Sequence, residues 1–263
     1  MDYPQMVDHR AMVEPVPRRI RGYLDNVCVF DTTRAIYVWD SPNYPWYQVP
    51  SDDVRLELLT DDGKSDRHRL GISRVHTLSV GDITRPGVAR RYGLDADPAV
   101  AGTVRFEWSA LDAWFEEDEE VYVHPRNPYT RVDALRSSRL VTITLAGVTL
   151  AKSAATVMVF ETGLPTRYYF DRTAVDFSYL VPSEIRTECP YKGRTSHYWS
   201  ARVGDTTVKD LAWSYDFPDR SLTPIKNMVA FYNEDVDLTV DGRLIERPAG
   251  PGTASRKAQL LAR

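Results

Sequence analysis

The segment from residue 24 to residue 59 reads LDNVCVFDTTRAIYVWDSPNYPWYQVPSDDVRLELL, and the segment from residue 145 to residue 180 reads LAGVTLAKSAATVMVFETGLPTRYYFDRTAVDFSYL. Matching positions carry the same residue in the pairs Val38 and Val159, Val54 and Val175, and Leu59 and Leu180. An offset of about 120 residues is the size of a domain and too long for a solenoid repeat. The chain therefore contains two related domains, which we call copy one and copy two.

The sequence of each copy predicts short β-strands. Apolar residues alternate with polar ones over residues 27–39 and 141–150, where β-branched and aromatic residues are frequent, and this pattern is typical of strands. Glycine and proline residues separate such runs at short intervals. We therefore expect a mainly β fold class with two tandem repeated small β domains. Each should be a partly open barrel or sandwich with few short helices.

Several segments carry more local expectations. Residues 61–68 are charged and predict an exposed loop, and residues 83–103 contain five glycine or proline residues and predict irregular structure. Residues 109–117 predict one or two helical turns that Ser109 caps. The pair Asp241–Gly242 predicts a tight hairpin turn.

Composition shifts mark the domain boundaries. Residues 1–16 are polar and rich in proline, and they predict an extended N-terminal arm. Copy one then spans residues 17–128 and copy two spans residues 129–247. Residues 248–263 contain few residues that form cores, and they predict a disordered tail.

The bulk composition excludes several classes of protein. A net charge of −4 and a pI near 5.8 do not suit a general nucleic-acid binder. Two cysteines without a CxxC motif predict neither a disulfide framework nor a zinc site, and we expect no metal and no cofactor. The N-terminus has no apolar signal region and no apolar run is long enough to span a membrane, so we expect a cytoplasmic protein. Common nucleotide-binding, hydrolase and zinc-protease motifs are also absent from the sequence.

The two copies differ most at residues that can carry chemistry. Copy two has six such residues, of which copy one retains only the glutamate, as Glu117: Arg167, Cys189, Lys192, Asp210, Trp213 and Glu234. One interpretation is that copy two holds a functional site and copy one has lost it, and the best-formed pocket is then expected in copy two. The other interpretation is neutral divergence of surface loops.

The segment CPYKG, residues 189–193, is the sharpest of these features. Pro190 and Gly193 favour a tight turn, which can bring the ammonium of Lys192 near the sulfur of Cys189. A nearby cation favours the thiolate, which is the nucleophilic form of cysteine. Cys189 and Lys192 are therefore candidate catalytic residues. The alternative is a small packing residue beside a structural turn.

Four further groups complete the candidate site. Glu234 and Asp210 are candidate acid–base residues, unless they serve only as a cap and a turn acid. Alternation along a strand places Arg167 and Tyr169 on one face, where the arginine can bind a carboxylate or a phosphate. The remaining candidates are aromatic residues that line a pocket or belong to the core, namely Tyr191 and Trp213.

At these residues the chain resembles the family catalogued as domain of unknown function 427, in its tandem-copy form. The motifs that carry the resemblance are DTTRAIYV from residue 31, FETGLPTRYY from residue 160, CPYKG from residue 189, DLAWSY from residue 210 and AFYNEDVD from residue 230. The resemblance implies a small β domain similar to the β-tent group. The zinc-binding cysteines of that group are absent, so it implies no zinc site. The family has also been labelled nucleotidyltransferase-like, but the sequence has no acidic pair on a Gly-Ser strand to support that activity.

Three hypotheses about function follow. The first is an enzyme that acts on a small anionic metabolite in copy two, with Arg167 and Lys192 holding the anion. The second is a non-catalytic domain that binds a ligand in the same pocket, and the third is a structural interaction module. A small-molecule partner is expected, whereas a nucleic acid or a membrane is not. The sequence leaves the oligomeric state open.

Overall fold

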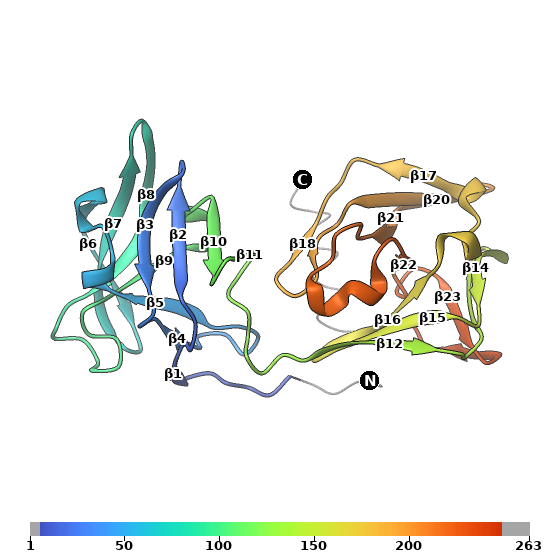
Figure 1. The fold of residues 1–263 in the computed structure, drawn as a ribbon, viewed down its shortest axis with the longest axis horizontal. Helices are drawn as coiled ribbons and strands as arrows, with labels where there is room; N and C mark the ends of the chain where they lie inside the picture. Colours follow the sequence, from blue (N-terminus) through green and yellow to red (C-terminus); the bar gives the residue numbers. More distant parts are fainter. Residues whose placement is uncertain (1–5, 249–263) are drawn as a thin grey trace. The chain divides into compact units, whose positions relative to one another are not determined.

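The chain folds into two compact units that meet in the sequence between Asn127 and Pro128 (Figure 1). The structure is a computed structural model that describes residues 6–248. Both units consist mainly of β-strands, which confirms the predicted fold class. None of the helices in the described residues has the length and apolar character needed to cross a bilayer.

Copy one contains two antiparallel sheets. Its strands are β1 (Val13–Pro15), β2 (Ile20–Leu24), β3 (Val27–Thr32), β4 (Ile36–Val38), β5 (Trp46–Pro50), β6 (Leu59–His68), β7 (Gly71–Val80), β8 (Ile83–Tyr92), β9 (Thr103–Phe106), β10 (Ala113–Glu116) and β11 (Glu119–Val121). Three short 3-10 helices connect them: η1 (Ser51–Asp53), η2 (Leu56–Leu58) and η3 (Trp108–Ala110). The seven-stranded sheet has the order β1-β4-β5-β9-β8-β7-β6, and the four-stranded sheet has the order β11-β10-β2-β3.

Copy two repeats this arrangement. Its strands are β12 (Val132–Ser137), β13 (Val141–Leu145), β14 (Val148–Ser153), β15 (Thr156–Glu161), β16 (Leu164–Phe170), β17 (Leu180–Ser183), β18 (Glu188–Cys189), β19 (Gly193–Arg194), β20 (His197–Val203), β21 (Thr206–Ser214), β22 (Val229–Phe231), β23 (Asp237–Val240) and β24 (Arg243–Ile245). Its 3-10 helices are η4 (Arg172–Ala174), η5 (Phe177–Tyr179) and η6 (Arg220–Ile225). The seven-stranded sheet has the order β12-β15-β16-β22-β21-β20-β17, the four-stranded sheet has the order β14-β13-β23-β24, and β18 and β19 form a separate hairpin.

The two sheet orders correspond strand by strand, from β1 and β12 at one edge to β6 and β17 at the other. The register agrees as well, because Val38 lies opposite Trp46 in copy one and Val159 lies opposite Arg167 in copy two. This correspondence lets each residue of copy two be compared with the residue that occupies its place in copy one.

The main core of each copy lies between its two sheets. In copy two, Ile143 and Leu238 of the small sheet pack with Phe170 and Phe231 of the large sheet. Copy two has a second apolar cluster, around Tyr169, Trp213, Leu222 and Ile225, on the other face of the large sheet. The large sheet of copy two is therefore covered on both faces, and the second face carries the candidate site.

Two local expectations are wrong, and the irregular structure expected for residues 83–103 is found only in part, at residues 93–102. Residues 61–68 form most of strand β6, which lies at a sheet edge where charged side chains stay in water. Residues 83–92 form β8, whose pairing with β7 shifts register near Pro86 and Gly87, so the two residues are accommodated at a bulge. Residues 113–116 form β10, because pairing with β2 outweighs their weak helical pattern, and only a single short turn precedes them.

The predicted hairpin at Asp241–Gly242 is confirmed. It joins β23 to β24, and the φ angles of its two residues are 51° and 79°, as a type I′ turn requires. Residues 13–15 of the predicted arm form β1 at the edge of the large sheet. The predicted disordered tail spans residues 248–263. All of it except residue 248 lies outside the described part of the chain.

Candidate functional site

The candidate site lies on the face of the large sheet of copy two that is turned away from the small sheet. Neighbouring residues of a strand point to opposite faces, so Tyr168 packs between the sheets while Tyr169 belongs to the second cluster. Trp213 and Tyr198 lie opposite each other on β21 and β20 and share that second face. We call this surface the aromatic face, and its residues are Arg167, Tyr169, Tyr198, Trp213, Tyr215 and Tyr232.

A buried ion pair joins two of the predicted site residues. The two terminal nitrogens of Arg167 donate to the two carboxylate oxygens of Glu234 at 2.6 and 2.7 Å, and the side chains are 15% and 4% exposed. The guanidinium also lies over the rings of Tyr232 and Trp213, at 5.3 and 5.9 Å from their centroids. Burial alone would lower the pKa of Arg167, but the hydrogen bonds and charge of Glu234 outweigh it and raise the pKa. Arg167 therefore stays charged.

Buried hydroxyl groups link the aromatic rings of this face. The indole N–H of Trp213 donates to the hydroxyl of Tyr169 at 3.2 Å, and the hydroxyls of Tyr198 and Tyr232 lie 3.1 Å apart. Burial raises the pKa of Tyr169 to about 12, although the charge of Lys192 partly opposes this rise. Burial also raises the pKa of Tyr198. These tyrosines are therefore neutral at physiological pH and act as hydrogen-bonding groups.

The hairpin of β18 and β19 carries the second cation of the site. Gly193 has a φ of 89°, a conformation that glycine adopts without strain, and it closes the turn that presents Lys192. The ammonium of Lys192 donates to the carboxylate of Glu161 at the end of β15. Burial alone would lower the pKa of Lys192, but the charges of Cys189 and Glu161 raise it. Lys192 is therefore charged, and Cys189 lies near enough to interact with it electrostatically.

The other two predicted residues have different surroundings. Asp210 has a left-handed φ of 52°, accepts a hydrogen bond from Ser183, and its N–H donates to the hydroxyl of Ser200 at 3.0 Å. These bonds join β17, β20 and β21, which is a structural task. Tyr191 lies half-buried in the turn between β18 and β19.

The structure thus brings Arg167, Tyr169, Trp213 and Glu234 together, with Lys192 acting on Tyr169 from the hairpin. Sequence reasoning missed Glu161, the partner of Lys192. One feature of the sequence could have revealed it, because Glu161 and Asp40 stand at the same position of the two aligned segments. A search for differences between the copies passes over an acidic residue that both copies share.

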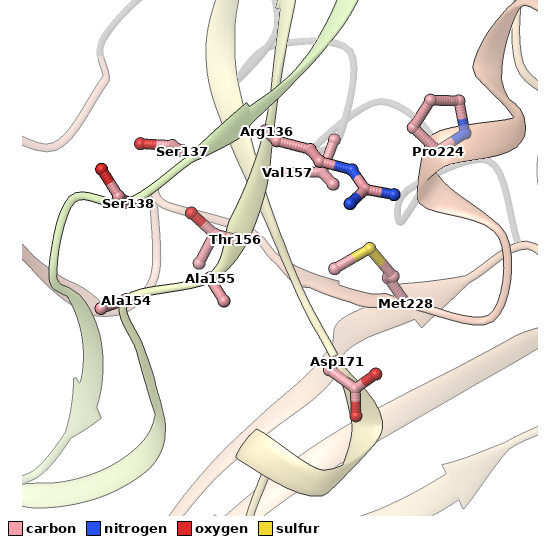
Figure 2. A pocket seen from close by; sticks show the side chains of 10 residues that line it. All are labelled: Arg136, Ser137, Ser138, Ala154, Ala155, Thr156, Val157, Asp171, Pro224 and Met228. Atoms are coloured by element: carbon pink, nitrogen blue, oxygen red, sulfur yellow. The ribbon is translucent and has the colours of Figure 1, made fainter.

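A cavity of about 730 Å³ opens elsewhere in copy two (Figure 2). Its lining includes Arg136, Thr156, Asp171 and Met228, and it includes none of the predicted site residues. The cavity therefore has a polar lining of its own, although Val157 and Met228 of that lining pack in the same apolar cluster as Tyr169 and Trp213.

A comparison with known protein families divides the chain as the structure does. Residues 12–117 and 133–242 each match the model of the domain of unknown function DUF427. The chain belongs to the DUF427 family. Among proteins with curated descriptions, none matches this chain. Membership of DUF427 therefore supplies a family and a tandem arrangement without a reaction.

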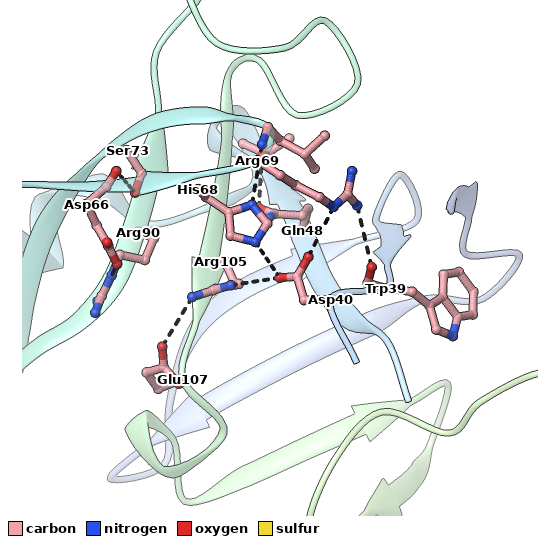
Figure 3. A network of polar contacts seen from close by, with 12 residues as sticks. Trp39, Asp40, Gln48, Asp66, His68, Arg69, Ser73, Arg90, Arg105 and Glu107 are labelled. Atoms are coloured by element: carbon pink, nitrogen blue, oxygen red, sulfur yellow. Dashed lines mark hydrogen bonds and ion pairs between the residues drawn. The ribbon is translucent and has the colours of Figure 1, made fainter. Parts of the chain in front are cut away.

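The first DUF427 copy has a polar network on the equivalent face (Figure 3). Asp40 stands where copy two has Glu161, and one of its carboxylate oxygens lies 3.0 Å from His68 Nε2 and 3.2 Å from Arg105 Nη1. Its other oxygen lies 3.7 Å from Arg69 Nε. Arg105 also lies over the ring of Trp46, 4.9 Å from its centroid. Copy one therefore surrounds this acidic residue with two arginines and a histidine, whereas Glu161 of copy two pairs with Lys192.

The interpretation of Glu117 as the retained site glutamate is wrong. Glu117 follows β10, has a φ of 50°, and accepts a hydrogen bond from the N–H of Arg19. Its counterpart in copy two is Asp241, which has a φ of 51° and accepts from the N–H of Leu140. Both residues hold a turn at the end of the small sheet. Glu234 instead follows β22, the counterpart of β9.

The described residues contain no group of three or more His, Cys, Asp or Glu side chains that is placed to hold a metal ion. The charged groups of the aromatic face are paired with each other, with one cation to each carboxylate. Such an arrangement can bind a polar or anionic molecule against aromatic walls, and it offers a cysteine beside a cation.

Proposed function

We propose that copy two of this DUF427 protein is an enzyme that acts on a small anionic metabolite at the aromatic face. The observation that carries the proposal is the buried Arg167–Glu234 pair, whose guanidinium lies over the rings of Tyr232 and Trp213. Lys192 supplies a second buried cation that acts on the hydroxyl of Tyr169. A few charged groups among aromatic walls are typical of small-molecule sites.

Each cation has a distinct task in this proposal. Arg167 presents a planar guanidinium that suits a carboxylate or a phosphate, and Lys192 adds a point charge from the hairpin. Tyr169, Tyr191 and Trp213 enclose the carbon skeleton of the ligand. Because Arg167 and Lys192 already bind carboxylates, an incoming anion either shares their remaining N–H groups or displaces a carboxylate.

The chemical step is assigned to Cys189. Cys189 lies close enough to Lys192 to contribute to the raised pKa of that ammonium, and a neighbouring cation favours a thiolate over a thiol. In the proposal the thiol of Cys189 gives its proton to Glu234 and adds as a thiolate to a carbonyl carbon of the bound anion. The carbonyl π bond opens, and Glu234 returns the proton to the resulting alkoxide. Both cysteines of the chain are free thiols, which suits the reducing cytoplasm that we propose as the location of the protein.

A specific observation favours a second candidate, a non-catalytic domain that binds the same kind of ligand. Both oxygens of Glu234 are hydrogen-bonded to Arg167. A carboxylate held in this way is a weak proton acceptor, because removing its partner contacts costs free energy. The geometry then serves recognition without catalysis.

Ligand binding and turnover separate these candidates. Binding of a panel of carboxylated and phosphorylated metabolites is followed by the fluorescence of Trp213, with Arg167→Lys as the test variant. Arg172→Lys is the matched control, because Arg172 also lies over aromatic rings, at 5.6 Å from Phe177 and 5.3 Å from Trp199, but belongs to the other face. The proposal expects binding that Arg167→Lys weakens and Arg172→Lys leaves unchanged.

Turnover of a bound metabolite, abolished by Cys189→Ser, supports the enzyme. Binding without turnover by the wild-type protein supports the recognition domain. If neither is found across the panel, the aromatic face is a structural core and the chain is an interaction module.

A further inference from the structure

The cavity of about 730 Å³ in copy two lies where β12, β15, η4 and η6 come together. In Figure 2 the hydroxyl side chains of Ser137, Ser138 and Thr156 lie on the left, the Arg136 guanidinium extends to the right, and Asp171 lies below. Apolar contacts come from Val157, Met228 and Pro224. Its size is within the range of small-molecule sites.

Two polar groups of the lining have no partner among the described residues. Arg136 is exposed and makes no ion pair there, although the chain has many acidic side chains. Thr156 is 1% exposed, and its hydroxyl makes no hydrogen bond to the described residues. A buried hydroxyl without a partner destabilises the fold, so a fold that retains one calls for an explanation.

Copy one serves as an internal control for this cavity. Its strands β1 and β4 pair in the same register as β12 and β15. Pro50 directly precedes η1 in copy one, just as Asp171 directly precedes η4 in copy two. At the positions of Arg136, Ser137, Ser138, Thr156 and Asp171, copy one has Pro15, Val16, Pro17, Ala35 and Pro50.

Every polar residue of the lining is thus apolar in the duplicate. Copy one does place Arg34 at the position of Ala155, but that arginine is bound to Asp53 at 2.6 Å. The fold is stable with apolar residues at these places, so the polar set of copy two is not needed to form the sheet.

Asp171 contributes the negative end of the cavity. One of its carboxylate oxygens accepts from the N–H and the hydroxyl of Thr173, at 2.9 and 2.6 Å. These hydrogen bonds lower the pKa of Asp171, so the carboxylate is ionised at neutral pH. The cavity therefore offers a cation, three hydroxyls and an anion, and this set suits a ligand with an acidic group and several hydroxyl groups.

We infer that this cavity is a second ligand site, separate from the aromatic face, and that it binds a polyhydroxylated anion such as a sugar phosphate or a sugar acid. The acidic group meets Arg136, and the ligand hydroxyls bond to Ser137, Thr156 and Asp171. The shared chemistry is an anion on a polyol, and a phosphate or a carboxylate can supply the charge.

The test uses the full chain with methyl-labelled methionine, because Met228 lines the cavity and reports binding locally. Glucose 6-phosphate and gluconate are titrated separately, with glucose as the neutral control, and Met228→Leu assigns the resonance. We expect one or both anions to shift the Met228 methyl signal, with glucose weaker by about tenfold or more, because the charge-assisted hydrogen bonds of Arg136 are lost.

Arg136→Gln and Thr156→Val are the test variants, and Arg139→Gln is the matched control. Arg139 lies three residues from Arg136 and is bound to Asp241 at 2.8 Å, outside the lining. We expect Arg136→Gln to weaken binding by about tenfold or more and Arg139→Gln to leave it unchanged. The inference is overturned if neither anion shifts the Met228 signal, or if both Arg136→Gln and Thr156→Val bind as tightly as the wild type. Neither result bears on the aromatic face, whose reporter is Trp213.

Discussion

At the scale of single residues, the aromatic face is organised by two ion pairs that have little access to water. Arg167 and Glu234 form one, and Lys192 and Glu161 form the other. Taking charges out of water is costly, and their mutual attraction repays the cost only when both partners are present and well hydrogen-bonded. Each pair is therefore more sensitive to the loss of one partner than an exposed pair would be.

Arg167→Met is expected to destabilise the protein strongly. It leaves the carboxylate of Glu234, which is 4% exposed, without its bidentate partner, and the expected loss is about 3 kcal/mol in the free energy of unfolding. Urea denaturation measures it. The double variant Arg167→Met/Glu234→Leu should recover part of the loss, and a loss below about 1 kcal/mol for the single variant, as for an exposed pair, would contradict the assignment.

Tyr169 should make stability fall at alkaline pH. Its pKa in the folded protein is about 12 and its reference value is 10.0, so above pH 10 the unfolded chain loses this proton first. The contribution is complete below pH 10 and falls by roughly 1.4 kcal/mol for each pH unit as the pH rises toward 12. Denaturation of wild type and Tyr169→Phe between pH 8 and pH 12 isolates it, because the other tyrosines are common to both. Parallel pH profiles would count against the prediction.

Cys189 should lose reactivity when Lys192 is replaced. In a Cys28→Ser background, Lys192→Met removes the cation and leaves Glu161 without its partner, so alkylation by iodoacetamide at neutral pH should slow by roughly tenfold. Lys226→Met is the control, since Lys226 lies over the ring of Phe217 at 5.5 Å. Equal rates in all three proteins would leave Cys189 as a packing residue.

Part of this site could be predicted from the sequence. Strand alternation alone places Arg167 and Tyr169 on one face. The contact of Lys192 with Glu161 could not be predicted in this way, because it depends on how the hairpin of β18 and β19 lies against β15. The sequence pattern of one strand predicts which of its residues share a face. Contacts between residues of separate elements can be known only from the tertiary fold.

At the scale of elements, turns were easier to predict than strands with unusual composition. The Asp241–Gly242 turn needs two residues with positive φ, which few sequences satisfy. Residues 61–68 have the composition of a loop, and the sequence therefore predicts one. They form an edge strand instead, and edge strands also carry many charged residues. Residues 113–116 show the opposite effect, since pairing with β2 overrides a local preference.

The hairpin of β18 and β19 should depend on Glu161 for its position. Glu161→Gln removes the charge that binds Lys192, so hydrogen exchange in residues 188–194 should become faster, by about tenfold. Glu188→Gln is the control, because Glu188 pairs with Arg194 within the hairpin and the two side chains are 41% and 56% exposed. Exchange that is unchanged in Glu161→Gln, measured by mass spectrometry, would show that apolar contacts alone hold the hairpin.

At the scale of the whole molecule, the duplication separates residues that maintain the fold from residues that can differ. Val38 and Val159, or Phe106 and Phe231, hold the same places in the two cores. Two other pairs of equivalent places exchange charge for aromatic character, namely Trp46 and Arg167, and Arg90 and Trp213. A third pair, Gln48 and Tyr169, exchanges a neutral amide for an aromatic ring. The repeat in the sequence was sufficient to predict two similar β domains. It is not sufficient to align Glu117, because the offset between equivalent places changes along the chain, from 121 residues for Val38 and Val159 to 125 residues for Phe106 and Phe231.

Each copy should fold without the other. The main cores around Phe30 and Phe170 each draw their residues from one unit only, Val7–Asn127 in the first case and residues after Asn127 in the second. A domain with its own core can fold alone, so separate proteins of residues 7–127 and 128–248 should each unfold cooperatively in urea. For each half, the free energy of unfolding should fall less steeply with urea concentration than for a full chain that unfolds in one step. The reason is that this slope scales with the surface exposed on unfolding. Circular dichroism and fluorescence that follow one transition in each half would support independent folding. A half without a cooperative transition, while the full chain has one, would show that its core is completed by the other copy.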